Sequence, residues 1–141
     1  MTPDQIKAIQ DSFAKVAPIS EQAAALFYGR LFEIAPAVKP LFRGDMKEQG
    51  RKLMATLAVV VNGLSDLPAI LPAASALAKR HVQYGVKAHD YAPVGEALLW
   101  TLERGLGAQW TSELKAAWAA AYGVLSDFMI GEAYGRSAAA E

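Results

Sequence analysis

The sequence predicts an all-α fold, and three observations lead to that fold class. Apolar residues recur at spacings of three and four along most of the chain, and no segment alternates with period two long enough to form a strand. Prolines and glycines separate the periodic segments, where helices begin and end. A length of 141 residues is typical of one domain with a real hydrophobic core. We therefore expect a single domain over residues 1–141, with a frayed tail at 137–141.

Composition narrows the possible classes of function. Acidic and basic residues balance at 14 each, which leaves no electrostatic footprint for nucleic acid. The chain has no cysteine, so disulfides, thiolate chemistry and iron–sulfur ligation are excluded. The first ten residues do not resemble a signal peptide, and the longest apolar run, Leu57 to Val61, is far shorter than a membrane span. We expect a cytoplasmic protein that binds neither nucleic acid nor membrane, as a monomer or weak homodimer.

The first half of the chain predicts three helices. Thr2 caps the first, with proline in its first turn, and Pro18 ends it. The second opens at Ser20 and ends near Pro36, and a kinked connection leads to a third helix over residues 46–63. Their inward stripes are Ile6, Ile9, Phe13 and Val16; Ala24, Phe27, Tyr28, Leu31 and Phe32; and Gln49, Leu53, Leu57, Val60 and Leu64.

The second half predicts three more helices. A turn at residues 66–68 leads into a helix that ends just after His81. A loop follows, Pro93 starts the next helix, and Thr111 caps the last one. Their inward residues are Ile70, Leu71 and Leu77; Val94, Leu98 and Leu102; and Leu114, Trp118, Ala121, Leu125 and Phe128. Helices of unequal length, broken by proline, suit a crossed-helix fold around a pocket better than a regular bundle.

A few polar residues on these stripes could carry chemistry, and each also has a purely structural interpretation. His81 is either a core residue or a metal ligand through neutral imidazole. The Tyr28 hydroxyl needs a partner, which could be a backbone carbonyl or a ligand. Gln49 lies at the start of its stripe, facing inward or at a solvated edge. Glu132 is either the exposed end of a helix or a buried carboxylate with a donor. His89 we expect in solvent, which leaves no second histidine for a two-histidine haem or a zinc site.

Four segments resemble bacterial single-domain globins, which are related to the haem domain of flavohaemoglobins. They are LFYGRLFEIAPAVKPLF at 26–42, LPAILPA at 67–73, KRHVQYGVKAHDYAPVGEALL at 79–99 and AWAAAYGVL at 117–125. They occur in the family's order and spacing along essentially the whole chain. The pattern HxxxGV…YxxVG at His81, together with FYxRLF at Tyr28, is specific. This resemblance favours metal ligation by His81 over core packing.

The resemblance implies a globin fold, a crossed-helix three-over-three sandwich around haem b (iron protoporphyrin IX), with His81 as the proximal iron ligand. It implies that Tyr28 and Gln49 are distal donors toward the bound gas and that Leu53 is the apolar distal residue. It also implies that Tyr91 approaches the haem from the loop after the proximal helix. The residues expected to contact the haem are Phe42, Leu53, Leu57, Leu77, His81, Val86, Tyr91, Val94 and Leu98.

The family also pairs the proximal histidine with a carboxylate on the last helix. Counted from Tyr122, that position falls at Ala133, and this chain has Glu132 beside it. Helix phase keeps Glu132 on the inward stripe, so we expect it to stand in for the missing carboxylate as a partner of His81, together with Tyr91. Such a partner would push electron density toward the iron.

Three classes of function follow from these expectations. The first is reversible binding of oxygen, and of nitric oxide or carbon monoxide, at pentacoordinate iron, for storage, delivery or scavenging. An apolar pocket would exclude water, and the two distal donors would stabilise the partial negative charge of bound oxygen. The second is haem catalysis, as a nitric oxide dioxygenase or a peroxidase-like enzyme. The flavin and nicotinamide domains of flavohaemoglobins do not follow here, so this class needs a separate reductase. The third is a haem sensor or a haem-free helical interaction domain.

Overall fold

The computed structural model describes residues 1–134, and the tail expected at 137–141 lies outside the described residues. The described part of the chain contains helices and no strand. The α-helices are α1 (Pro3–Val16), α2 (Ser20–Ile34), α3 (Met46–Gly63), α4 (Leu67–Gln83), α5 (Tyr91–Leu106) and α6 (Ser112–Tyr134). Short 3-10 helices connect them, namely η1 (Ala17–Ile19), η2 (Pro36–Leu41), η3 (Leu64–Asp66), η4 (Ala88–Asp90) and η5 (Gly107–Gln109). The predicted all-α class is confirmed.

Capping side chains set several of the helix starts. Thr2 forms a reciprocal capping box with Gln5, in which the Thr2 hydroxyl accepts from the Gln5 amide at 3.1 Å and the Gln5 side chain accepts from the Thr2 amide at 2.9 Å. Thr111 caps α6 by accepting from the Leu114 amide at 3.1 Å. Asp45 caps α3 by accepting from the Lys47 amide at 2.9 Å. The caps at Thr2 and Thr111 were predicted from sequence, whereas the one at Asp45 was missed.

One predicted boundary was wrong. We expected Pro93 to start a helix, but α5 begins two residues earlier, at Tyr91. Pro93 therefore occupies the third helical position. Proline is tolerated there because none of the first-turn amides has a partner inside the helix. The consequence is that Tyr91 belongs to the rigid first turn of α5 and not to the preceding loop.

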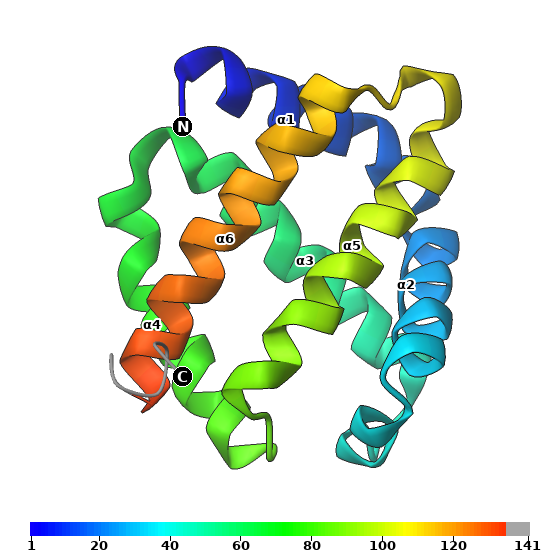
Figure 1. Ribbon diagram of the computed structural model, residues 1–141, viewed down its shortest axis with the longest axis vertical. Helices are drawn as coiled ribbons and strands as arrows, with labels where there is room; N and C mark the ends of the chain where they lie inside the picture. Colours follow the sequence, from blue (N-terminus) through cyan, green and yellow to red (C-terminus); the bar gives the residue numbers. More distant parts are fainter. Residues whose placement is uncertain (135–141) are drawn as a thin grey trace.

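The helices cross one another in two layers (Figure 1). In this view α5 and α6 lie in front and α3 passes behind them. The closest helix pairs are α2 with α5, α4 with α6, α2 with α3 and α1 with α6. This arrangement is the crossed-helix packing expected from the unequal, proline-broken helices, and not an up-and-down bundle.

Buried apolar side chains form two separate clusters, which we call the major core and the minor core. The major core joins α1, α2, α3, α5 and α6 and includes Ile9 (0% exposed) and Leu31 (1% exposed). The minor core consists of Ala74, Ala78, Tyr91 and Met129, so it lies between α4, the start of α5 and the end of α6. The α4 helix is thus attached to the domain mainly through its own small cluster.

A buried series of hydrogen bonds joins α6 to α1 within the major core. The Trp118 indole N–H donates to the Ser12 hydroxyl at 3.0 Å, and that hydroxyl donates to the Ile9 carbonyl at 2.9 Å. Each polar group in this series has a partner, so burial does not leave an unsatisfied donor.

Gly95 lets α5 approach α6 closely, so a larger residue at position 95 should destabilise the fold. A methyl group at this position would lie 2.7 Å from Cε2 of Tyr122. Such overpacking typically costs about 1–3 kcal/mol, whereas alanine gains about 1 kcal/mol over glycine in a helix interior. We expect Gly95→Ala to lower the free energy of unfolding in urea. The control is Gly123→Ala on α6, where a methyl group meets nothing within 4 Å and stability should hold or rise. Equal effects of the two variants would contradict this packing.

Candidate functional site

The HxxxGV pattern at residues 81–86 encodes the C-terminal end of α4. Gly85 has φ +94°, the left-handed conformation that glycine adopts without strain. The Val86 amide donates to the His81 carbonyl at 3.0 Å, and the Gly85 amide donates to the Val82 carbonyl at 3.0 Å. These two bonds form a Schellman motif, which ends the helix. The motif places the His81 side chain on the last turns of α4 and Val86 directly after it.

His81 has one ring nitrogen occupied and the other available. Nδ1 lies 2.8 Å from the Leu77 carbonyl oxygen, one turn earlier on α4. Because a carbonyl oxygen can only accept, Nδ1 must carry the proton, which leaves the lone pair of Nε2 free. Burial lowers the pKa of His81; the hydrogen bond to Leu77 acts in the opposite direction, and the nearby Arg80 charge adds to the lowering. The imidazole is therefore neutral at pH 7 with Nε2 as an acceptor, which is the form that ligates a metal.

Tyr28, on α2, belongs to a group of aromatic rings. Its ring centroid lies 5.3 Å from Phe42, at the end of η2, and 6.0 Å from Phe32 on α2. The side chain is 7% exposed. Burial raises the pKa of the Tyr28 hydroxyl, and Gln49 on α3 lies close enough to oppose part of that rise through hydrogen bonding. The phenol thus keeps its proton at neutral pH and remains a donor beside a half-buried amide.

The apolar residues predicted to contact a haem are divided between the two cores. Phe42, Leu53, Leu57 and Val94 pack against the major core, and Leu98 belongs to it. Leu77 and Val86 pack against the minor core, and Tyr91 belongs to it. Except for Leu98 and Tyr91, these side chains are only half-buried.

An apolar surface left half-buried by the protein itself suits contact with a flat apolar cofactor. By length and composition, the stretch Met46–Gln83 even passes as one membrane-spanning helix, although it comprises α3, η3 and α4. Only 17% of the most apolar 18 residues in this stretch are buried within the protein. The free Nε2 of His81 and these half-buried faces of α3 and α4 both fit a haem.

Two tyrosine rings lie beside His81, those of Tyr84, with centroids 6.0 Å apart, and Tyr91. The Tyr91 ring stacks on His81 with centroids 6.3 Å apart and an interplanar angle of 25°. The Tyr122 hydroxyl donates to the Tyr91 carbonyl at 2.6 Å, and the Tyr134 hydroxyl donates to the Val86 carbonyl. Burial raises the pKa of Tyr91 to about 12, with a smaller contribution from Tyr134, and burial also raises that of Tyr122. The hydroxyls of Tyr91, Tyr122 and Tyr134 are all protonated at neutral pH.

The inward orientation predicted for Glu132 was wrong. Its side chain is exposed, whereas Ala133 and Tyr134 are half-buried and pack against the minor core. The last turn of α6 contacts the domain through these two residues, and an unpaired carboxylate keeps its hydration by remaining in water. Glu132 therefore does not reach His81, and the expected stand-in for a proximal carboxylate is absent from this position.

Sequence reasoning missed the groups that hold the histidine side of the site. The acceptor for His81 is the backbone carbonyl of Leu77, which no side-chain pattern reveals. Tyr122 and Tyr134 lie on α6, where a tyrosine within an apolar stripe is the signal that could have indicated them. His89, in contrast, was predicted correctly: its side chain is 83% exposed and lies 3.4 Å from Asp90.

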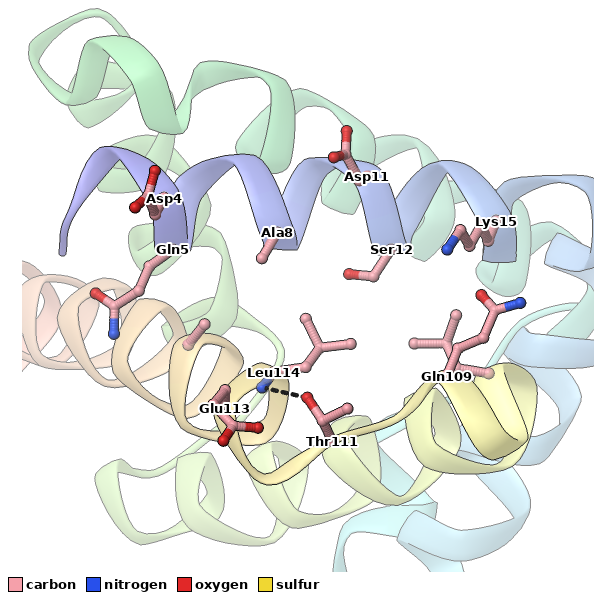
Figure 2. Close-up of a pocket in the computed structure, with 12 residues that line it drawn as sticks. Asp4, Gln5, Ala8, Asp11, Ser12, Lys15, Gln109, Thr111, Glu113 and Leu114 are labelled. Carbon is pink, nitrogen blue, oxygen red and sulfur yellow. Dashed lines mark hydrogen bonds between the residues drawn. The ribbon is translucent and has the colours of Figure 1, made fainter.

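A separate surface groove lies between α1 and the junction of α5 with α6 (Figure 2). It has a volume of about 390 Å³ and an apolar floor that includes Ala8 and Leu114, with Asp4, Asp11 and Lys15 along α1. None of the residues that line it belongs to the site around His81. The groove is thus independent of the features described above.

Comparison with known proteins gives the same family for this fold and site. The family model described as Globin matches residues 25–129. The chain is 35% identical over 137 residues to a flavohemoprotein of Bordetella parapertussis, covering 93% of this chain and 34% of that protein. It is 33% identical over 124 residues to a flavohemoprotein of Chromobacterium violaceum, covering 84% of this chain and 31% of that protein. The chain spans about a third of the length of these curated relatives.

A solved structure extends this likeness to the whole fold. The bacterial globin from Campylobacter jejuni matches with a TM-score of 0.81 at 26% identity, and the match covers 99% of this chain and all of that one. The helices and their crossing arrangement are therefore those of a known architecture. This chain belongs to the globin family.

Proposed function

We propose that this globin binds haem b, iron protoporphyrin IX, through Nε2 of His81, and that it binds oxygen and other diatomic gases reversibly. The single observation that carries the proposal is the hydrogen bond from Nδ1 of His81 to the Leu77 carbonyl, since it fixes the tautomer that ligates iron. The family match and the flavohemoprotein relatives support a haem cofactor. Haem iron would supply the site that binds a diatomic gas.

The protein's own contribution is to hold the cofactor and to stabilise the gas. Phe42, Leu53 and Leu57 pack against the major core, and Leu77 and Val86 pack against the minor core. These apolar side chains would exclude water from a bound haem. An environment that lacks water slows oxidation of ferrous iron. Tyr28 and Gln49 would supply hydrogen-bond donors to a polar gas ligand, and hydrogen bonds of this kind contribute about 1 kcal/mol each, or more to a charged acceptor. Retention of the gas is favoured over its release.

Absorption spectra of the ferric, ferrous and carbon monoxide forms test the proposal directly. We expect a Soret band in protein expressed with haem available, a five-coordinate ferrous form, and a stable oxygen complex. A colourless protein would instead favour a haem-free helical interaction domain. A six-coordinate ferrous form, in which a side chain occupies the gas position, would contradict the open distal site.

A second candidate function is the dioxygenation of nitric oxide to nitrate, and the flavohemoprotein relatives favour it because their name couples a flavin to a haem. Turnover of this kind needs a reductase to supply electrons to the haem, and this chain covers about a third of those proteins. Sustained consumption of nitric oxide with a generic reductase and NADH would support the enzyme. A single burst, stoichiometric with the haem, would leave reversible binding as the function.

A further inference from the structure

The charges of this protein are segregated, although the whole chain is neutral, with 14 acidic and 14 basic residues. The segment from η2 to η4, residues 36–90, contains eight lysines and arginines but four aspartates and glutamates. The rest of the described chain has the opposite balance, with five basic and nine acidic residues. The basic segment is the one that contains Phe42, Gln49 and His81. Positive charge is therefore concentrated on the elements that form the candidate site.

The basic side chains of this segment lie beside the candidate site. Arg43, Arg80 and Lys87 are immediate chain neighbours of predicted haem contacts. The η2–α3 connection and the α4–η4 connection also meet in space, because a Cβ atom at Gly85 would lie 3.1 Å from Cδ2 of Leu41. Both connections are at the lower end of the view in Figure 1. We use the name cationic face for the exposed basic residues in and beside these connections, namely Lys39, Arg43, Lys47, Lys79, Arg80 and Lys87.

The charge of the cationic face is not neutralised by the described part of the chain. No described carboxylate lies within 4.0 Å of the charged nitrogens of these six side chains. The acidic side chains next to them in sequence have other partners. Asp45 caps α3, and Glu48 pairs with Arg51 at 2.9 Å. The Asp90 carboxylate accepts from the Lys87 backbone amide at 2.9 Å. The six cations thus remain available to an acidic partner.

Two exposed apolar side chains accompany these cations. Val82 is 42% exposed and Tyr84 is 55% exposed. Both fall between Arg80 and Lys87 in the chain. The Tyr84 ring lies 6.0 Å, centroid to centroid, from the ring of His81. Interfaces between proteins combine an apolar centre with a polar rim, and an apolar pair among cations has the composition of a docking surface for an acidic protein.

We propose that the cationic face docks an acidic electron-transfer protein, which reduces the haem. The inference rests on the proposed binding of haem through His81, and it names the chemistry of the separate reductant. The docked donor loses one electron and the ferric iron gains it, so no bond forms or breaks and no proton is transferred. Positive charge beside the site steers an acidic donor to the place where its redox centre comes near the iron. Steering of this kind raises association rates about 10–10³-fold.

Nuclear magnetic resonance tests the docking separately from electron transfer. The probe is an oxidised flavodoxin of net negative charge, added to the isotope-labelled ferrous carbon monoxide form of the protein. We expect amide shifts at residues 39–47 and 79–87. These shifts should fade as the salt concentration approaches about 1 M, where the Debye length is only about 3 Å. Shifts that fall only on α1 and α6, or shifts that do not depend on salt, would overturn the inference.

Two double variants with the same change in net charge test the position of the docking surface. Lys47→Gln with Lys87→Gln removes two cations of the face, whereas the control, Lys15→Gln with Lys115→Gln, removes two exposed lysines from α1 and α6. The measurement is the second-order rate at which reduced flavodoxin reduces the ferric protein at low ionic strength. We expect the first variant to slow this rate about tenfold and the control to change it less than about twofold. Equal rates in the two variants would contradict the inference.

Other occupants of the cationic face give different results. Sedimentation with phosphatidylserine vesicles at about 0.15 M salt, and sedimentation velocity of the protein alone, should show neither vesicle binding nor a dimer. Vesicle binding or a dimer that is lost in Lys47→Gln with Lys87→Gln, but kept in the control, would assign the face to a membrane or to a second copy, and the inference would be wrong. A protein without a Soret band would overturn the proposed function as well, whereas absent docking in a coloured protein would overturn this inference alone.

Discussion

Replacing His81 by alanine is expected to abolish the five-coordinate ferrous spectrum. The variant lacks the free Nε2 lone pair, and no other described histidine lies near the site, because His89 is 83% exposed on η4. Loss of partners that merely orient a ligand typically weakens metal binding about 10–100-fold, so loss of the ligand itself should exceed that range. The measurement is a titration of the protein with haem, followed by its absorption spectrum.

His89→Ala is the matched control, since it removes the second histidine of the chain and should leave haem binding unchanged. Free imidazole added to the His81→Ala variant should restore much of the five-coordinate spectrum, because it can occupy the space left by the side chain. A variant without His81 that takes up haem with an unchanged spectrum would contradict the whole assignment of the site.

Tyr28→Phe is expected to accelerate oxygen release by about 10–100-fold, which corresponds to the roughly 1.5–3 kcal/mol of a hydrogen bond to a charged acceptor. The hydroxyl is protonated at neutral pH, since burial raises the pKa of Tyr28. Carbon monoxide carries little charge on its outer atom, so its release should change much less. Stopped-flow measurement of both dissociation rates separates the hydrogen bond from a change in packing.

The substitution keeps the aromatic ring, which packs against Phe42 and Phe32, so the pocket should hold its shape. Tyr84→Phe provides a control on the opposite side of the site, where the hydroxyl belongs to a side chain that is 55% exposed. Oxygen release should be unaffected there. Unchanged release from Tyr28→Phe would mean that Tyr28 is not the distal donor, and Gln49 would then be the next group to replace.

Local patterns in the sequence predicted much of the fold because they depend on neighbours along the chain. The predicted cap at Thr2 involves residues three apart, and the predicted helix end after His81, which the structure shows to be a Schellman motif, spans only a few residues. The helical spacing of apolar residues likewise predicted the buried faces of α1 and α2, whereas most of the stripe predicted for α3 is only half-buried. Pro93 shows where such reasoning loses precision, since proline is acceptable at any first-turn position and does not specify which one.

The candidate site was predictable in its residue types but not in its hydrogen bonds. His81, Tyr28 and Gln49 were identified from sequence, whereas the Leu77 carbonyl that sets the tautomer of His81 is a backbone atom. Glu132 shows the opposite error. Its helical phase is inward, but the last turn of α6 contacts the minor core through Ala133 and Tyr134.

Local sequence patterns were enough to predict the all-α fold, most helix ends and a histidine late in a helix, because these follow from spacing and capping within a few residues. Only the tertiary structure decided which groups surround that histidine. It separated the apolar side chains into two cores, left the Tyr91 hydroxyl without a hydrogen-bond partner among the described residues and placed Glu132 in solvent. Those outcomes depend on how α4, α5 and α6 pack against one another, and contacts between distant segments leave no periodic pattern in the chain.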